Sequence, residues 1–172
     1  MRVVPLSCDH CGVELGPEVD TVAFCCRTCS RTWSVGDEGL QAQAVRWAHP
    51  LAGQPWWWMP GTVSVQTRQT FGRDVGEDPR WQQLRGIWVP AFERDVKKVQ
   101  QLAQQLSFNP PSPAVTQPQP KAYHEPCVLT ASDARELVDV IVLHVETKRA
   151  DKLRDLGFTV ELGEPELWIL GG

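Results

Sequence analysis

The chain has 172 residues, carries a net charge of −4 and is 42% hydrophobic. This length fits one domain or two small ones, and the composition is that of a soluble globular protein. No apolar run reaches the roughly 18 residues of a membrane helix and the first ten residues lack the apolar stretch of a signal peptide, so we expect a cytoplasmic protein.

Five of the six cysteines lie within the first 29 residues, with the spacing of metal ligands. Cys8 and Cys11 form one pair on a turn, and Cys29 forms a second pair with either Cys25 or Cys26. Two such pairs place four sulfur ligands around one tetrahedral ion, which is the arrangement that zinc prefers. We therefore predict one structural zinc site, closed on all four sides and without a position for an activated water.

The order C-x-x-C-G, a gap of hairpin length and F-C-C-x-x-C resembles the MYM, FCS and TRASH-type zinc fingers. It is also similar to the small zinc peptide that inhibits DNA gyrase and to the metal-binding segment of heavy-metal transporting ATPases. The resemblance implies Cys8, Cys11, Cys25 and Cys29 as ligands, with Cys26 as the alternative to Cys25. It leaves the function open, because fingers of this kind bind proteins, nucleic acids or metals in transit.

The segment after the cysteines predicts a helix and then a strand. Asp37 is a candidate N-cap for a helix that ends before Pro50, because apolar residues recur at helical spacing between them. Residues 55–61, PWWWMPG, are bounded by helix breakers, whereas residues 62–67 alternate like a strand. The three tryptophans are candidates for a partner-binding surface, for base stacking or for filling of the core. These residues are Trp56, Trp57 and Trp58.

An amphipathic pattern predicts a helix over residues 90–107, with an apolar stripe that packs into its own domain or against a second helix in a dimer. Residues 109–120 contain five prolines and no charge, which is typical of an extended linker. We therefore divide the chain into a zinc-finger-containing, Trp-rich module at 1–108, a Pro-rich linker at 109–126 and a small αβ module at 127–172.

The third part of the chain begins with a capping-box signal at Thr130 and the aspartate three residues later. The run 138–145 is rich in β-branched residues and favours a strand, although one long helix over 131–156 is the alternative. Gly157 is placed to end a polar helix at residues 152–156.

Residues 158–162 and 166–170 predict a terminal β-hairpin around a Gly-Glu-Pro turn. A helix followed by a hairpin resembles the last helix and wing of a winged-helix domain, which makes the neighbouring basic residues candidates for nucleic-acid binding. These residues are Lys148, Arg149, Lys152 and Arg154. Acidic residues interrupt this patch and the whole chain is negative, so a solvated helix face is the alternative.

The predicted fold class is α+β. The sequence has no phosphate-binding glycine loop, HExxH or GxSxG motif, so we predict a non-enzymatic protein without a small-molecule substrate. Our leading hypothesis is a zinc-stabilised adaptor or subunit of a larger assembly in nucleic-acid machinery, of phage, plasmid or defence-system origin among others. The alternatives are metal handling or sensing, with Cys26 and His10 as extra ligands, and DNA binding through the C-terminal module. His124 and Cys127 fit either a second metal or a buried, inert thiol.

Overall fold

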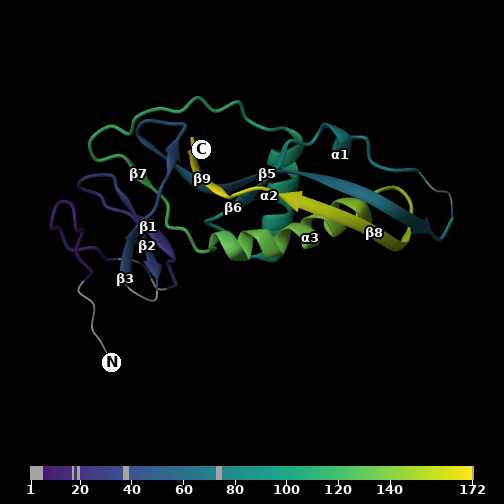
Figure 1. Cartoon of the computed structure of the whole chain (residues 1–172), viewed down its shortest axis with the longest axis horizontal. Coiled ribbons are helices and arrows are strands. Elements are labelled where there is room, and N and C mark those ends of the chain that lie inside the picture. The colour runs from purple at the N-terminus through teal and green to yellow at the C-terminus, as the bar shows by residue number, and fades with distance from the viewer. Residues whose placement is uncertain (1–5, 17, 19, 37–38, 73–74, 172) are drawn as a thin grey trace.

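The computed structural model describes residues 6–16, 18, 20–36, 39–72 and 75–171, which form an α+β fold. Its elements, in chain order, are β1 (Ala23–Cys25), β2 (Thr32–Gly36), β3 (Gly39–Ala42), β4 (Arg46–Trp47), β5 (Ala52–Thr70), α1 (Arg80–Gln83), β6 (Gly86–Pro90), α2 (Val96–Phe108), β7 (Tyr123–His124), α3 (Ala131–Thr147), β8 (Leu153–Leu162) and β9 (Glu166–Leu170). Figure 1 shows an elongated molecule, with the β1–β3 sheet at one end and the β5–β8 ribbon extending to the other.

A long antiparallel ribbon forms the axis of the molecule. β8 and β9 follow each other along β5, with Gly61 paired to Leu162 and Trp58 paired to Glu166. The backbone N–H of Gly163 donates to the Pro60 carbonyl oxygen at 2.7 Å, so the Gly-Glu-Pro segment continues the ribbon and does not reverse it. The two predicted C-terminal strands are present, but each pairs with β5, and the predicted hairpin between them is not observed.

The sheet β4-β9-β5-β6 places tryptophans on both of its faces. Trp57 enters the main core, on the face that α3 covers, and Trp56 and Trp58 point to the opposite face together with Trp88 of β6 and Trp168 of β9. Seven of the eight tryptophans are buried, so filling of the core explains the high tryptophan content.

Helix α2 confirms the amphipathic helix expected near residues 90–107, although it begins later, at Val96. Asp95 is its N-cap and accepts a hydrogen bond from the Lys98 backbone N–H at 3.0 Å. Its buried side, with Val99 and Ala103, joins the main core and packs along β6. The stripe therefore packs within its own chain.

Helix α3 begins at the predicted capping box, in which Thr130 and Asp133 exchange side-chain-to-backbone hydrogen bonds. The strand predicted over 138–145 is wrong, because this run belongs to α3. The buried apolar residues of the whole helix follow a helical period. These residues are Ala134, Val138, Ile141, Val142 and Val145. Burial of one stripe outweighs the β-propensity of its side chains. The helix ends at Thr147, so the polar helix predicted at 152–156 is also wrong, since Leu153 already begins β8.

No helix in the described part of the chain combines the length and the hydrophobicity that a crossing of the bilayer requires.

A separate three-stranded sheet, β1-β2-β3, carries the cysteine region. The helix predicted after Asp37 is wrong over the described residues, where Gly36 pairs with Gly39 in the antiparallel β2–β3 ladder. Asp37 itself lies outside the described residues. The sheet contacts the main body where Ala23 bridges Cys127 and where β1 approaches β7.

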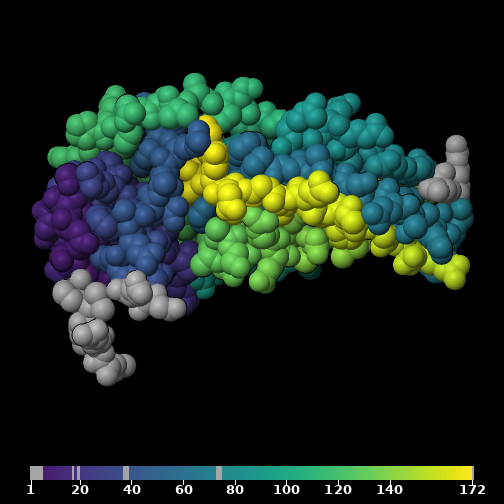
Figure 2. All heavy atoms as spheres, viewed as in Figure 1, coloured from purple at the N-terminus to yellow at the C-terminus, as the bar shows by residue number. Residues whose placement is uncertain are grey.

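The Pro-rich segment at 109–120 lies along the face of the sheet that carries Trp56, Trp58, Trp88 and Trp168, here called the tryptophan face. The backbone N–H of Thr116 donates to the Trp47 carbonyl oxygen at 2.7 Å, and that of Gln119 donates to the Pro50 carbonyl oxygen at 2.8 Å. Figure 2 shows this segment in green along the upper edge of the molecule. The elements before and after it share one sheet and one core, because β8, β9 and α3 all pack on β5.

A buried group of charged side chains fixes the end of α3 against β5. Arg68 donates to Glu146 at 2.9 Å and also pairs with Asp151, and these three side chains are 5%, 0% and 3% exposed. Trp81 Nε1 and Arg149 also donate to the Glu146 carboxylate, at 2.7 and 3.0 Å. Each buried charge thus has an opposite charge or a hydrogen-bond donor beside it, as burial requires.

Candidate metal centre

Two turns with the same hydrogen-bond pattern carry the candidate ligands. In the first, Cys8 N–H donates to the Val13 carbonyl oxygen at 2.8 Å and Gly12 N–H donates to the Cys8 carbonyl oxygen at 2.7 Å. Gly12 has φ +71°, a left-handed conformation that glycine adopts without steric cost. This turn directs Cys8 and Cys11 toward one point.

The second turn repeats this geometry one strand later. Cys26 N–H donates to the Arg31 carbonyl oxygen at 2.8 Å, and Ser30 N–H donates to the Cys26 carbonyl oxygen at 2.8 Å. Ser30 has φ +60° and occupies the place of the left-handed glycine in the first turn. Cys26 and Cys29 therefore have the same backbone setting as Cys8 and Cys11, as two matched knuckles do in a four-cysteine site.

The four sulfur atoms of Cys8, Cys11, Cys26 and Cys29 lie within 4.8 Å of one another. The Sγ atoms of Cys8 and Cys29 are 3.6 Å apart, and so are those of Cys11 and Cys26. A zinc ion bound at about 2.3 Å to four thiolates in a tetrahedron separates the sulfurs by roughly 3.8 Å. The spacing of the thiols thus fits a metal ion of this size, and the arrangement is a zinc-finger-like knuckle.

The third ligand corrects the sequence prediction, because the cluster contains Cys26 and not Cys25. Cys25 is the last residue of β1, and its Sγ lies 3.7 Å from the Ala122 carbonyl oxygen. Burial raises the pKa of the Cys25 thiol to about 11, so this thiol is protonated at neutral pH. Cys26 begins the turn after β1 and its sulfur lies in the cluster, whereas that of Cys25 faces the Ala122 carbonyl oxygen.

The thiols of the cluster differ in how readily they ionise. Burial opposes ionisation of Cys8, but the backbone N–H groups of Cys11 and His10 donate to its sulfur and lower its pKa to about 6. Burial, together with the thiols of Cys8 and Cys26, raises the pKa of Cys29 to about 12. A divalent ion would supply the charge that keeps all four ligands as thiolates.

A small apolar cluster, distinct from the main core, packs around the buried cysteines of the knuckles. It contains Leu15, Phe24 and Trp33, with Cys8 and Cys26 buried among them. Such a cluster is small for independent folding, which is the situation in which a structural metal stabilises a module.

The two cysteine turns and the β1–β3 sheet, together called the metal module, meet the main sheet at His124 of β7. The His124 ring is fully buried, its Nε2 lies 2.8 Å from Thr32 Oγ1, and its Nδ1 lies 2.6 Å from the Glu125 carbonyl oxygen. Cys127 is also fully buried, and burial raises its pKa to about 12. Neither His124 nor Cys127 belongs to a group of possible metal ligands among the described residues. The burial of Cys127 fits the second prediction, a buried and inert thiol.

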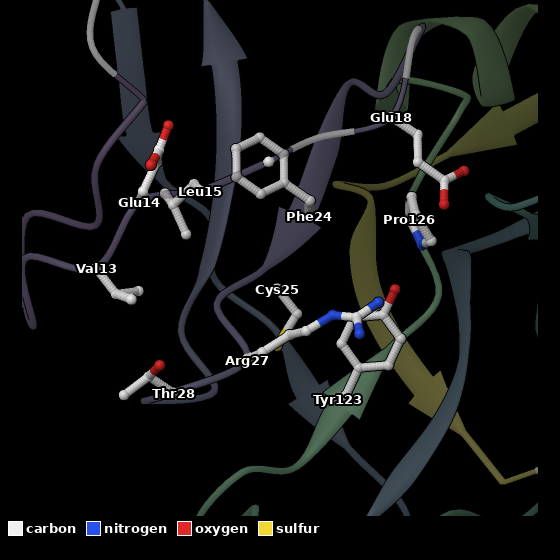
Figure 3. A pocket seen from close by; sticks show the side chains of 11 residues that line it. Val13, Glu14, Leu15, Glu18, Phe24, Cys25, Arg27, Thr28, Tyr123 and Pro126 are labelled. Atoms are coloured by element: carbon white, nitrogen blue, oxygen red, sulfur yellow. The ribbon is translucent and has the colours of Figure 1, made fainter.

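A cavity of about 150 Å³ lies between the second knuckle and β7. Figure 3 shows the Arg27 side chain extending over the ring of Tyr123, and the guanidinium carbon is 4.5 Å from the ring centroid. Phe24 and Leu15 form the apolar side of the cavity, and Glu18 lies near Pro126 at the other end of the cavity. The cation–π contact between Arg27 and Tyr123 joins the metal module to the main body.

The predicted partner-binding tryptophans lie mostly inside the protein. Trp56 is 6% exposed and Trp57 is 5% exposed, and the indole N–H of Trp57 donates to the Leu129 carbonyl oxygen at 2.9 Å. Trp58 retains partial exposure on the opposite face, beside Trp88. Only Trp58 of the three therefore offers part of its ring to a ligand.

The predicted nucleic-acid-binding residues do not share one helix face. Lys148 is the C-cap of α3, and Arg149 pairs with the buried Glu146. Lys152 precedes β8, and Arg154 lies on it with its guanidinium 5.7 Å from the ring centroid of Phe71. Because β8 and β9 do not pair with each other, the helix-and-wing arrangement that suggested DNA binding is not formed.

Comparisons with protein-family models, with curated proteins and with solved structures return no match. The resemblance to MYM, FCS and TRASH-type fingers therefore rests on the knuckle alone, and no family match confirms the type of finger.

The sequence contains a signal that identifies Cys26. Residues 8–11 and 26–29 are both C-x-x-C, and matched spacing predicts matched turns. The family resemblance favoured Cys25 instead, because it compared the order of cysteines and not the geometry of the two turns.

Proposed function

We propose that this protein is a zinc-stabilised, non-catalytic adaptor or subunit of a larger assembly. The observation that carries the proposal is the convergence of Cys8, Cys11, Cys26 and Cys29 within 4.8 Å on two matched turns. Four thiolates leave no open coordination position, so the ion would organise the fold and would not activate water. Zinc would hold the first knuckle, which has little regular structure of its own, against the β1–β3 sheet.

The surroundings of the buried polar groups support a non-catalytic role. His124 has both ring nitrogens engaged, and Glu146 accepts hydrogen bonds from three donors. Groups that are buried and fully paired serve the fold, whereas a catalytic acid or base must reach a substrate in a cleft.

Two observations weigh against metal handling as the main role. The fifth thiol near the centre, Cys25, is directed at the Ala122 carbonyl oxygen and cannot serve as an exchange ligand in this conformation. His10 follows Cys8 on the turn but is not part of the sulfur cluster. Nucleic-acid machinery is the proposed setting, and the support for it is the resemblance of the knuckle to fingers that occur in such assemblies.

The proposal is tested by quantifying zinc in the purified wild-type protein and in two serine variants of neighbouring cysteines. We expect one zinc ion per chain in the wild type, loss of the ion in Cys26→Ser, and retention in Cys25→Ser. The two variants differ by one position and make the same chemical change, so each is the control for the other. Thermal unfolding is measured with and without a chelator on the same samples.

Retention of zinc in Cys26→Ser and its loss in Cys25→Ser would show that the assignment of the third ligand is wrong. A cooperative transition that a chelator leaves unchanged would overturn the structural role of the ion. The adaptor role is tested by affinity purification from the host, where a stoichiometric partner should be retained with Cys25→Ser and lost with Cys26→Ser.

A further inference from the structure

A ring of tryptophans and prolines lines a cavity of about 340 Å³ on the face of the sheet opposite α3. The tryptophans come from β5, β6 and β9, and the prolines come from the segment that crosses this face. These residues are Trp58, Trp88, Trp168, Pro110, Pro111 and Pro113. The size lies at the lower end of the range for ligand sites, and the fixed φ of proline makes this wall stiff.

Trp58 is the tryptophan of this cavity that keeps contact with solvent. Its ring centroid lies 6.1 Å from that of Trp88, which in turn lies 6.2 Å from that of Trp168. Trp88 and Trp168 are 4% and 7% exposed and hold Trp58 from behind, whereas Trp58 is partly exposed. Among the described residues the indole Nε1 of Trp58 has no hydrogen-bond acceptor, although those of Trp57, Trp81 and Trp168 each have one.

The charged residues that line this cavity and its neighbour are arginines, and the nearby Glu166 is paired with Arg46 at 3.0 Å. The second cavity, of about 230 Å³, adjoins the first and shares Trp58 and Arg85 as lining residues. Arg80 and Arg85 are the charged residues that line the two cavities, and no carboxylate of the described residues lines either one. Arg80 is paired with Asp78, whereas Arg85 is exposed and has no ion-pair partner in the described part of the chain. Of the charged residues that line the two cavities, Arg85 is thus the one that no described carboxylate neutralises, in a chain of net charge −4.

A ligand that matches this surface must present a flat ring to Trp58 and a negative charge to Arg85. Nucleotides in a single strand have both, because their bases are free to stack and each carries a phosphate. The bases of a duplex stack on one another and would not reach Trp58. We propose that the groove formed by Trp58, Trp88, Arg80 and Arg85 binds single-stranded nucleic acid, with one base on Trp58 and a phosphate at Arg85. This inference rests on the proposed function, to which it adds a nucleic-acid contact.

The test is the fluorescence anisotropy of a labelled oligothymidylate, titrated at low salt with the full-length, zinc-loaded protein. We expect Trp58→Ala to weaken binding by about 5-fold to 150-fold, the range that corresponds to the loss of one stacked base. Arg85→Ala should weaken binding and reduce the salt dependence by about 0.7 in log–log slope, the value for one phosphate contact to a single strand. Duplex DNA of the same length should bind more weakly.

The matched control is Arg154→Ala combined with Lys152→Ala, which removes two exposed charges at the start of β8, among the basic residues that the sequence suggested for nucleic-acid binding. This variant should bind the oligonucleotide as the wild type does. If its binding is lost while Arg85→Ala binds normally, the basic patch is the site and the inference is overturned. Arg85 is exposed, so Arg85→Ala is expected to fold, and its urea midpoint checks this independently of binding.

Two further outcomes separate this inference from the proposed function. A wild-type protein that contains zinc and binds no oligonucleotide at low salt would overturn the inference and leave the proposed function standing. A protein that contains no zinc would overturn the proposed function first. Saturable quenching of tryptophan fluorescence by an acidic, aromatic peptide, without oligonucleotide binding, would assign the groove to a protein partner and would also overturn the inference.

Discussion

His124 is expected to make the stability of the protein fall between pH 7 and pH 5. The ring lies where the metal-bearing sheet meets β7, in contact with Trp47, and is fully buried. Burial lowers its pKa from 6.5 to about 4, against a hydrogen bond to the Glu125 carbonyl oxygen that acts in the opposite direction. The folded protein therefore keeps His124 neutral at a pH where the unfolded chain protonates it.

The sign and size of the effect follow from this difference in pKa. Below pH 6.5 the unfolded state binds the additional proton, so acid stabilises the unfolded state and the free energy of unfolding decreases. The full difference between 6.5 and about 4 corresponds to about 3 kcal/mol, of which about 2 kcal/mol is lost between pH 7 and pH 5. Below the folded-state pKa the loss levels off.

The assay is urea unfolding of the wild type and of His124→Gln at pH 7 and pH 5, with zinc in excess. Glutamine retains a side chain that can hydrogen-bond to Thr32, and it does not titrate. The variant should be less stable than the wild type at pH 7 and should lose about 2 kcal/mol less on acidification. Protonation of the metal ligands affects both proteins equally and cancels. Equal losses in the two proteins would refute the reasoning.

Three further substitutions test the packing. Glu146→Gln should lower the free energy of unfolding by about 3 kcal/mol, because the buried Arg68 and the partly buried Arg149 lose this carboxylate. Glu161→Gln on the exposed face of β8 is the control and should change the free energy of unfolding by less than about 0.5 kcal/mol in urea. Gly53→Ala should lower the free energy of unfolding by at least about 2 kcal/mol, because the added Cβ would lie 2.2 Å from a backbone oxygen of β9. Gly16→Ala, which has open space around it, is the control in thermal unfolding, and equal melting temperatures of the two variants would contradict the geometry. Asp95→Ala should remove about 1 kcal/mol by loss of the α2 N-cap, measured by urea unfolding, and an unchanged midpoint would show that this cap contributes nothing.

The sequence predicts those features that depend on local chemistry. The capping box at Thr130, the helix that contains Val99 and Ala103, and the presence of strands near both ends of the Gly-Glu-Pro segment each follow from neighbouring residues. The metal site is local as well, and three of its four predicted ligands are members of the sulfur cluster. For the two helix caps the hydrogen-bond partners lie three positions apart in the chain.

The features that the sequence does not predict depend on distant partners. Residues 138–145 have the composition of a strand, but the main core buries one helical stripe of them. The Gly-Glu-Pro segment is a turn signal in isolation, and it extends the ribbon because β5 has 19 residues and pairs with both flanking strands. Residues 109–120 have the composition of a free linker, yet the tryptophan face gives them a surface to pack on. Period and composition contain no information on such partners.

The ribbon also sets the order in which this chain can fold during synthesis. Gly61 pairs with Leu162, about 100 positions later, so the sheet cannot close until that part of the chain has left the ribosome. The thiols of Cys8 and Cys29 are only 21 positions apart, and the knuckles can capture their ion long before β8 exists. We therefore expect the metal module to fold before the main sheet does. In that interval the exposed edges of β5 are open to pairing with other chains, and chaperones would be needed most.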